Sequence, residues 1–165
     1  MIRAAGPGDA GAIVFIYNHY IKNSPATFEE MPLSVQDMAV RMRELGRGYP
    51  WIVWEENGEI LGYAYMHRYH ERMAYRFTAE DSIYIKAGCE GRGIGKALLE
   101  SLIAAARKMK LRALLSIITV PNAASVALHE KFGFQKVGQF HEVGYKFKTW
   151  LDVGYWELLF TGDEK

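Results

Sequence analysis

Four glycines and two basic residues fall within one short stretch, GCEGRGIGKALLE, at residues 88–100. A glycine-rich loop that runs into a helix presents backbone N–H groups at the positive end of the helix dipole, which favours an anion. Glycine also lets a bulky pyrophosphate approach the backbone closely. The stretch therefore predicts a phosphate-binding loop, with a ligand-free turn as the alternative.

Two well-known phosphate loops do not match this spacing. The nucleotide-binding P-loop would need glycine at position 90 and Ser or Thr at position 97, where this chain has Glu90 and Ala97. The dinucleotide motif G-x-G-x-x-G, begun at Gly91, meets Lys96 in place of its last glycine. Neither a nucleoside triphosphate nor NAD is favoured as the ligand.

Three other reactive side chains carry less weight. His67 and His70 lack a third ligand at a defined spacing, so no metal site is expected. Cys89 stands near a helix start without an evident partner base, and we regard it as incidental to catalysis.

The elements around the loop alternate between helix and strand patterns, which is typical of a mixed α/β domain. A short first strand leads to a helix that Asp9 would cap, and a second helix would run from a Ser34 cap to Gly46, with Val35, Met38, Met42 and Leu45 on one face. Asn57-Gly58 between two strand-like runs predicts a tight hairpin.

The second half of the chain continues this alternation. SIYIK (82–86) is a strand that enters the glycine loop, and apolar spacing predicts a helix from Ile94 to Met109. ALLSIITV (113–120) reads as a strand covered on both faces, and Asn122 would cap a helix that ends at Gly133. Closing strands are expected at residues 134–140 and 153–160, in a single domain over residues 1–165.

Composition excludes several function classes. Twenty basic and 19 acidic residues give a formal charge of +1, so no broad field attracts nucleic acid or an acidic membrane. No apolar run reaches the roughly 18 residues of a membrane span, and Asp9 interrupts any signal-peptide core. We expect a cytoplasmic protein.

The strand, the loop from Glu90 to Gly95, the helix and the later segment PNAASVALHEKFGF (121–134) resemble the GNAT (GCN5-related) N-acetyltransferases, whose Q/R-x-x-G-x-G/A motif holds the pyrophosphate of acetyl-CoA. ATFEE (26–30), AYRFTAEDSIYI (74–85) and GYKFKTWLDVGYWEL (144–158) look like the phosphinothricin/methionine sulfoximine acetyltransferase branch. The resemblance implies the GNAT fold, a mixed central sheet flanked by helices, and a homodimer.

The resemblance also implies a set of residues that bind acetyl-CoA. They are Ile83, Tyr84, Ile85, Glu90, Gly91, Arg92, Gly93, Ile94, Gly95, Lys96, Asn122 and Ser125. Glu90 departs from the family motif, which has Gln or Arg there. A carboxylate beside a pyrophosphate is unfavourable by charge, so we expect weakened cofactor binding, with Arg92 and Lys96 near enough in sequence to compensate.

Acetyl transfer to an amine needs a base, because near neutral pH the amine is mostly ammonium and only the free amine attacks a thioester. Glu80 matches the glutamate that the family places at the acceptor amine, and a solvated carboxylate is the alternative. Asp81 would point to the opposite face of the strand. By analogy with the family, a backbone N–H near Tyr84 or Ile85 would bind the oxyanion.

Asn122 and His129 lie seven residues apart, two helical turns, and therefore share one face. Many family members have tyrosine in the place of His129, near the sulfur of CoA. His129 would protonate the departing thiolate or bind a relay water, and Asn122 would hold the pantetheine arm or order the helix start. The alternative for His129 is a hydrogen-bonded packing residue.

Five further residues are candidates for binding the acceptor. Arg76 lies four residues before Glu80, so in an extended strand both would face one side, where Arg76 would bind an α-carboxylate. An exposed structural arginine is the alternative. Aromatic candidates for the acceptor wall are Phe28, Phe77, Tyr145 and Trp150, each of which could instead serve packing.

These features together predict an enzyme with acetyl-CoA as cosubstrate and no metal. It would acetylate the α-amine of a small amino-acid analogue, namely phosphinothricin, methionine sulfoximine or methionine sulfone, by direct attack on the thioester. Acetylation of another amine or of a protein N-terminus is one alternative, and a non-catalytic acyl-CoA-binding module is the other. The expected partner is the small-molecule amine.

Overall fold

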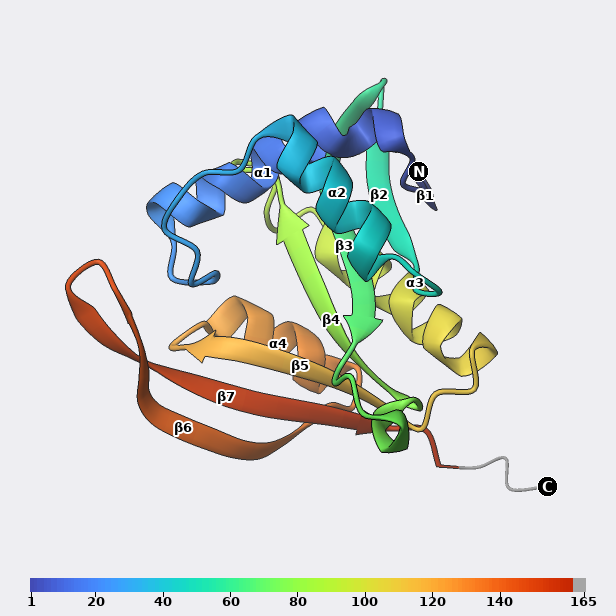
Figure 1. Ribbon diagram of the computed structural model, residues 1–165, viewed down its shortest axis with the longest axis vertical. Helices are drawn as coiled ribbons and strands as arrows, with labels where there is room; N and C mark the ends of the chain where they lie inside the picture. The colour runs from blue at the N-terminus through green and yellow to red at the C-terminus, as the bar shows by residue number, and fades with distance from the viewer. Residues whose placement is uncertain (162–165) are drawn as a thin grey trace.

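Seven strands form one mixed sheet with four helices on its two faces in the computed structural model of the chain, which describes residues 1–161 (Figure 1). The strand order is β1-β2-β3-β4-β5-β7-β6. The strands are β1 (Ile2–Ala4), β2 (Trp51–Glu56), β3 (Glu59–Arg68), β4 (Thr78–Ile85), β5 (Ala113–Val120), β6 (Gln135–Lys146) and β7 (Thr149–Leu159). The helices are α1 (Ala10–Asn23), α2 (Val35–Leu45), α3 (Ile94–Lys108) and α4 (Ala123–Lys131).

The two central strands pair over a short distance and then separate. β4 and β5 are parallel and pair from Thr78–Ala113 to Glu80–Leu115, whereas the other neighbouring strands are antiparallel. In Figure 1 the two strands meet at the lower right and spread apart toward the left. The sheet is therefore split along its middle, and each strand turns one unpaired edge toward the split.

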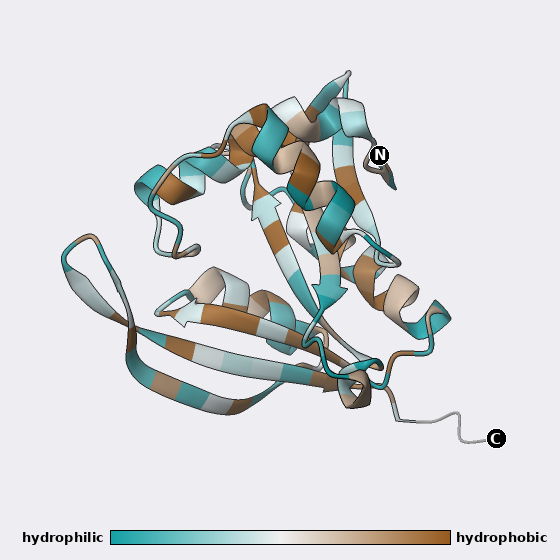
Figure 2. Cartoon of the chain, in the orientation of Figure 1, coloured by the Kyte–Doolittle hydropathy of each residue, from teal (hydrophilic) through white to brown (hydrophobic). Residues whose placement is uncertain are grey.

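Each face of the sheet carries its own hydrophobic core. One core lies under α1 and α2 and includes Ile13, Ile16, Met38, Tyr63 and Tyr65. The other lies under α3 and includes Leu98, Leu102, Leu114, Ile118 and Trp156. Figure 2 shows hydrophobic and hydrophilic residues alternating along α1 and α2, as expected for helices that cover a sheet.

The starts of the first two helices differ from each other. Ser34 caps α2 as predicted, since its Oγ accepts the Asp37 N–H at 3.1 Å. Asp9 is the N-cap residue of α1 as predicted, but its carboxylate does not cap the helix: it accepts from Arg3 and from the Gly6 N–H, both at 2.7 Å, and so closes the preceding 3-10 turn (Pro7–Asp9). Within α2 the expected apolar face is incomplete, because Val35 is 54% exposed.

The turn of the β2–β3 hairpin could be predicted from the sequence, whereas the turn of the β6–β7 hairpin could not. Asn57 and Gly58 have φ angles of 51° and 80°, which confirms the predicted turn between β2 and β3. The closing strands are confirmed but longer than expected. They join at Phe147 and Lys148, whose φ angles are 53° and 60°. Because neither residue is glycine, this turn could not be predicted from the sequence.

None of the helices within residues 1–161 is both long enough and apolar enough to cross a membrane.

Candidate active site

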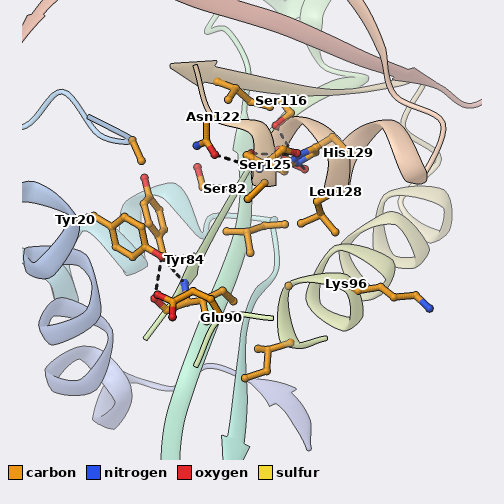
Figure 3. A pocket seen from close by; sticks show the side chains of 18 of the residues that line it. Tyr20, Ser82, Tyr84, Glu90, Lys96, Ser116, Asn122, Ser125, Leu128 and His129 are labelled. Carbon is orange, nitrogen blue, oxygen red and sulfur yellow. Dashed lines mark hydrogen bonds and ion pairs between the residues drawn. The ribbon is translucent and has the colours of Figure 1, made fainter. Parts of the chain in front are cut away.

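A cavity of about 430 Å³ occupies the split between β4 and β5 (Figure 3). Its walls are residues 81–85 of β4, residues 116–119 of β5, the loop before α3 and the start of α4. Most of the predicted cofactor residues line it, namely Ile83, Tyr84, Ile85, Glu90, Gly91, Gly93, Ile94, Gly95, Lys96, Asn122 and Ser125. Arg92 is the predicted cofactor residue that does not line this cavity.

The glycine loop has the backbone shape that a phosphate cradle needs. Gly88, Gly91 and Gly93 have φ angles of 82°, 74° and 81°, a region that side-chain-bearing residues rarely adopt. A Cβ added at any of the three would meet no atom within 4 Å, so the space over the loop is open. Because α3 begins directly after Gly93, the first-turn N–H groups face this space. These residues fit the pyrophosphate of acetyl-CoA.

The charged side chains of the loop are arranged differently from expectation. Glu90 accepts the Gly88 N–H at 2.8 Å, which ties the carboxylate into the loop. Arg92 donates to Glu56 at the end of β2, at 2.6 Å, so its charge is already balanced outside the cavity. Lys96 extends away from Glu90 in Figure 3. The expected compensation of Glu90 by Arg92 is therefore wrong, because Glu56 holds the guanidinium.

The unpaired edge of β4 offers backbone groups to the cavity at alternate residues. Lys86 donates its N–H to Leu61 on β3, so by the antiparallel alternation Tyr84 also faces β3 and Ile85 faces the split. The Ile85 carbonyl accepts from the Tyr20 hydroxyl at 2.9 Å, and the Ile85 N–H donates to that hydroxyl at 3.2 Å. An oxyanion donor at Tyr84 conflicts with this register, whereas Ile83 and Ile85 point the correct way.

Glu80 lies on the α1 and α2 side of the sheet, at the last position of β4 that pairs with β5. Its side chain is 22% exposed, and its carboxylate lies 3.9 Å from His67 Nε2. Burial raises the pKa of the Glu80 carboxyl above its ordinary value, His67 acts against this shift, and the neighbouring charge of Asp81 adds to it. A carboxylate with a raised pKa is a stronger base than an ordinary glutamate, as proton removal from an ammonium requires.

Asn122 and His129 both border the cavity from α4. Asn122 Oδ1 accepts the Ser125 N–H at 3.2 Å, which confirms its predicted role in ordering the helix start. His129 is buried, and its ring contacts Ser116 Oγ at 2.9 Å and the Ser125 carbonyl at 2.7 Å (Figure 3). Neither Ser116 nor the third partner, Asp81 at 3.2 Å, was among the predicted site residues.

The predicted acceptor-wall residues come from four places: Phe28 lies in the chain after α1, Phe77 directly precedes β4, Tyr145 is on β6 and Trp150 is on β7. Phe28 packs against Gly144, where a Cβ would be too close to the Phe28 ring to be accommodated without a shift. Tyr145 and Trp150 pair with ring centroids 4.8 Å apart. All three are substantially exposed, so the packing alternative does not account for them.

Arg76 does not lie on an extended strand with Glu80, as the sequence analysis expected. It ends a 3-10 turn (Met73–Tyr75) with φ −59° and ψ −17°, and β4 begins at Thr78. Strand alternation therefore cannot place Arg76 beside Glu80. Its guanidinium stacks on Phe77, 4.5 Å from the ring centroid, and donates to the Met73 carbonyl.

Lys146 is a site-forming residue that the sequence analysis missed. It is 3% exposed, and its ammonium donates to the carbonyls of Ser24 at 2.9 Å and Thr27 at 2.7 Å. Lys146 thereby fastens the chain around Phe28 to β6. Burial lowers the pKa of this ammonium. The two histidines considered as metal ligands contact neighbouring side chains: His67 lies 3.9 Å from Glu80, and the ring centroids of His70 and Tyr75 are 5.0 Å apart.

Comparison with known proteins places this geometry in a family. The family model described as Acetyltransferase (GNAT) family matches residues 13–134. Phosphinothricin N-acetyltransferase of Alcaligenes faecalis is 40% identical over 92% of this chain and 78% of its own length. L-methionine sulfoximine/L-methionine sulfone acetyltransferase of Pseudomonas paraeruginosa is 36% identical over 95% of this chain and 92% of its own length.

A solved structure gives the same result for the fold. The phosphinothricin acetyltransferase of Sinorhizobium meliloti, in complex with acetyl-CoA, superimposes with a TM-score of 0.93 and 37% identity, covering 96% of this chain and 87% of that one. The chain belongs to the GNAT family of acetyltransferases, and the expected GNAT fold is confirmed.

Proposed function

We propose that this protein transfers the acetyl group of acetyl-CoA to the α-amine of a small amino-acid analogue such as phosphinothricin, methionine sulfoximine or methionine sulfone. The observation that carries the proposal is the split between β4 and β5, which joins an open glycine cradle on one side to Glu80 on the other. The names of the relatives support the acceptor class.

The chain's own residues divide the work in this proposal. The glycine loop and the first turn of α3 bind the pyrophosphate, and Asn122 orders the start of α4 beside the pantetheine arm. Glu80 takes the proton of the acceptor ammonium, and a cleft-facing N–H of β4 stabilises the oxyanion. The bound cosubstrate supplies the activated acetyl group.

Acceptor selection is assigned to the face that carries Glu80. Phe28, Phe77, Tyr145 and Trp150 form its aromatic wall in the proposal, since their exposed rings are available to a ligand. Arg76 has no carboxylate partner among residues 1–161, so its guanidinium is available to an α-carboxylate. Arg76→Ala should raise KM for an amino-acid acceptor more than for a carboxylate-free amine.

The proposal includes a homodimer in the cytoplasm. Besides Tyr145 and Trp150, which the proposal assigns to the acceptor wall, four apolar side chains of the β6–β7 hairpin are more than half exposed, namely Val137, Phe140, Val143 and Phe147. Exposed apolar patches of this kind mark interaction surfaces. Sedimentation of the purified protein tests the dimer.

Steady-state release of CoA from acetyl-CoA tests the activity. The acceptor panel contains phosphinothricin, methionine sulfoximine, methionine sulfone, ordinary amino acids, a polyamine and a short peptide. We expect saturable turnover with the methionine-like compounds, sharply reduced by Glu80→Gln and unchanged by the exposed Glu100→Gln control. Turnover confined to peptide or polyamine would overturn the acceptor class, and acetyl-CoA binding without turnover would indicate a binding module.

A further inference from the structure

A buried carboxylate and a buried imidazole meet beside the cavity, near the point where β4 and β5 separate. The side chains of Asp81 and His129 are 1% and 4% exposed, and Asp81 Oδ2 lies 3.2 Å from His129 Nε2. Asp81 directly follows the last paired residue of β4, and Ser116 directly follows the last paired residue of β5. All three side chains line the cavity that takes the cosubstrate in the proposed function.

The hydrogen-bond partners of His129 fix where its protons must be. Nδ1 lies 2.7 Å from the Ser125 carbonyl oxygen, which can only accept, so Nδ1 carries a proton. Nε2 faces Asp81 Oδ2 and Ser116 Oγ, and an ionised carboxylate can also only accept. With Asp81 ionised, the ring therefore carries both protons and is an imidazolium.

The other charged groups around the ring do not compete with Asp81. On α4, Glu130 turns away and accepts from Trp156 Nε1 at 3.1 Å, and Lys131 is exposed. Beyond the helix, the ring meets the edge of Phe134 with centroids 5.0 Å apart, and on β5 it meets the neutral Ser116. Burial disfavours the charged ring, but the hydrogen bond and charge of Asp81 outweigh it and raise the pKa of His129.

Folding stability alone does not account well for the buried Asp81–His129 pair. Desolvation of two charges offsets most of their mutual attraction, and a buried ion pair can often be replaced by apolar residues without loss. Moreover, Asp81 Oδ1 is buried without a hydrogen-bond partner among residues 1–161, which costs further free energy. A costly, incompletely satisfied charge that borders a binding cavity indicates a task in the reaction.

We propose that Asp81 is a positioning residue that keeps His129 in the imidazolium form beside the cavity, where the cluster supplies a proton to the departing thiolate. This inference rests on the proposed function. As the free amine nitrogen bonds to the acetyl carbon it gives up its second proton to solvent, the carbon–sulfur bond breaks and its electron pair stays on sulfur. Sulfur takes a proton from the Ser116 hydroxyl, which takes the Nε2 proton of His129, and solvent later restores the ring.

The direction of transfer agrees with ordinary acidities. A thiol has a pKa of about 8.5, above the ordinary histidine value of about 6.5, so an imidazolium is ordinarily the stronger acid of the two. The thiolate is a modest base and a good leaving group, so the acid's contribution should fall at the low end of the usual range. We expect about 10²-fold in kcat from this cluster.

The first experiment follows the ring itself in the cofactor-free protein. The imidazole nitrogens of ¹⁵N-histidine-labelled protein are titrated by NMR, and His129→Gln identifies the His129 signals. We expect both nitrogens protonated at pH 7 in the wild type, and a lower His129 pKa in Asp81→Asn, because only the hydrogen bond to the Ser125 carbonyl then opposes burial. A neutral His129 at pH 7 in the wild type would overturn the proposal, even if Asp81→Asn does not fold.

The second experiment measures kcat against pH with the best acceptor of the panel. The alkaline limb should move to lower pH in Asp81→Asn and stay in place in Glu100→Gln. The double variant Asp81→Asn/His129→Gln should be no slower than His129→Gln, because Asp81 acts through His129. Unchanged limbs, or additive losses, would make the pair structural. If no amine is acetylated, the proposed function fails, while the NMR titration still decides whether Asp81 sets the charge of His129.

Discussion

Glu80 and Asp81 are consecutive carboxylates on β4, and the pleat of the strand turns them to opposite faces of the sheet. Glu80 lies on the face that takes the acceptor in the proposed function, with 22% of its side chain exposed and its carboxylate 3.9 Å from His67 Nε2. Asp81 lies on the cofactor face with 1% of its side chain exposed and contacts His129 directly. Strand alternation therefore gives one dipeptide two environments.

The difference shows how two like side chains acquire opposite tasks. Around Glu80, burial raises the pKa of the carboxyl, which suits the base that the proposed function requires. The carboxylate of Asp81 instead raises the pKa of the His129 imidazole, which suits His129 to the acid role in the proposal. Environments that push titratable groups apart in this way identify acid and base. Each of the following predictions removes one side of this division.

Glu80→Gln carries the largest expected effect. It keeps the shape of the side chain and removes the base, so kcat should fall by about 10²- to 10⁴-fold while KM for acetyl-CoA stays within about twofold. In the wild type, kcat/KM should fall as the pH drops through the raised pKa of Glu80, on the neutral side of its ordinary 4.5. Steady-state kinetics across pH 4–9 checks both. A variant that retains kcat would remove Glu80 from the chemistry.

Lys146→Met should produce the second largest effect, on the acceptor side. The substitution leaves the carbonyls of Ser24 and Thr27 without their donor, at a cost of about 2–4 kcal/mol in unfolding free energy. Release of the chain around Phe28 should also raise KM for the amine, with KM for acetyl-CoA unchanged. Urea unfolding and kinetics are compared with those of Lys148→Met, an exposed lysine on the same hairpin. Equal behaviour of the two variants would contradict the fastening role.

Gly93→Ala tests the cofactor side with a matched control. Alanine at a φ of 81° costs about 1–2 kcal/mol of strain, and its methyl group enters the open cradle, so KM for acetyl-CoA should rise about tenfold. Gly48→Ala places the same methyl at a φ of 80°, also in open space, away from the cavity. It should lose similar stability and bind acetyl-CoA normally. A matching rise of KM in both variants would point to general strain.

Local patterns were sufficient to predict the parts of the fold that lie within a few residues of each other. The Ser34 and Asn122 caps, the Asn57-Gly58 turn and the glycine loop before α3 each depend on contacts over two to four residues. The resemblance then supplied the mixed sheet flanked by helices and many of the cavity-lining residues. Where the prediction failed locally, as at Phe147-Lys148, the sequence has no glycine to reveal the positive φ angles.

The contacts around the candidate site could not be predicted from local patterns, because they join residues far apart in the sequence. His129 meets Asp81 across 48 residues, Arg92 meets Glu56 across 36, and Lys146 meets Ser24 across 122. Strand alternation correctly predicted that Asp81 faces away from Glu80. No local pattern predicts that His129 is the side chain that Asp81 contacts on that face. Only the packing of α4 against β5 and the split strand β4 brings the imidazole there.

The smallest predicted effect separates the two faces by the pH at which each affects stability. A raised carboxyl pKa in the folded state means that protonated Glu80 stabilises the fold below its ordinary 4.5, and this contribution is lost as the pH rises through the raised value. The raised His129 pKa stabilises below 6.5 and is lost as the pH rises through the folded value.

Urea midpoints measured from pH 4 to 9 should resolve these two windows. Glu80→Gln should gain stability over the wild type above the acid window, because the buried charge is removed, and should leave the neutral window unchanged. Asp81→Asn should abolish the neutral window, because its histidine no longer takes up a proton on folding. If Glu80→Gln altered the neutral window instead, the two carboxylates would be coupled through the sheet, and β4 would not separate the acceptor face from the cofactor face.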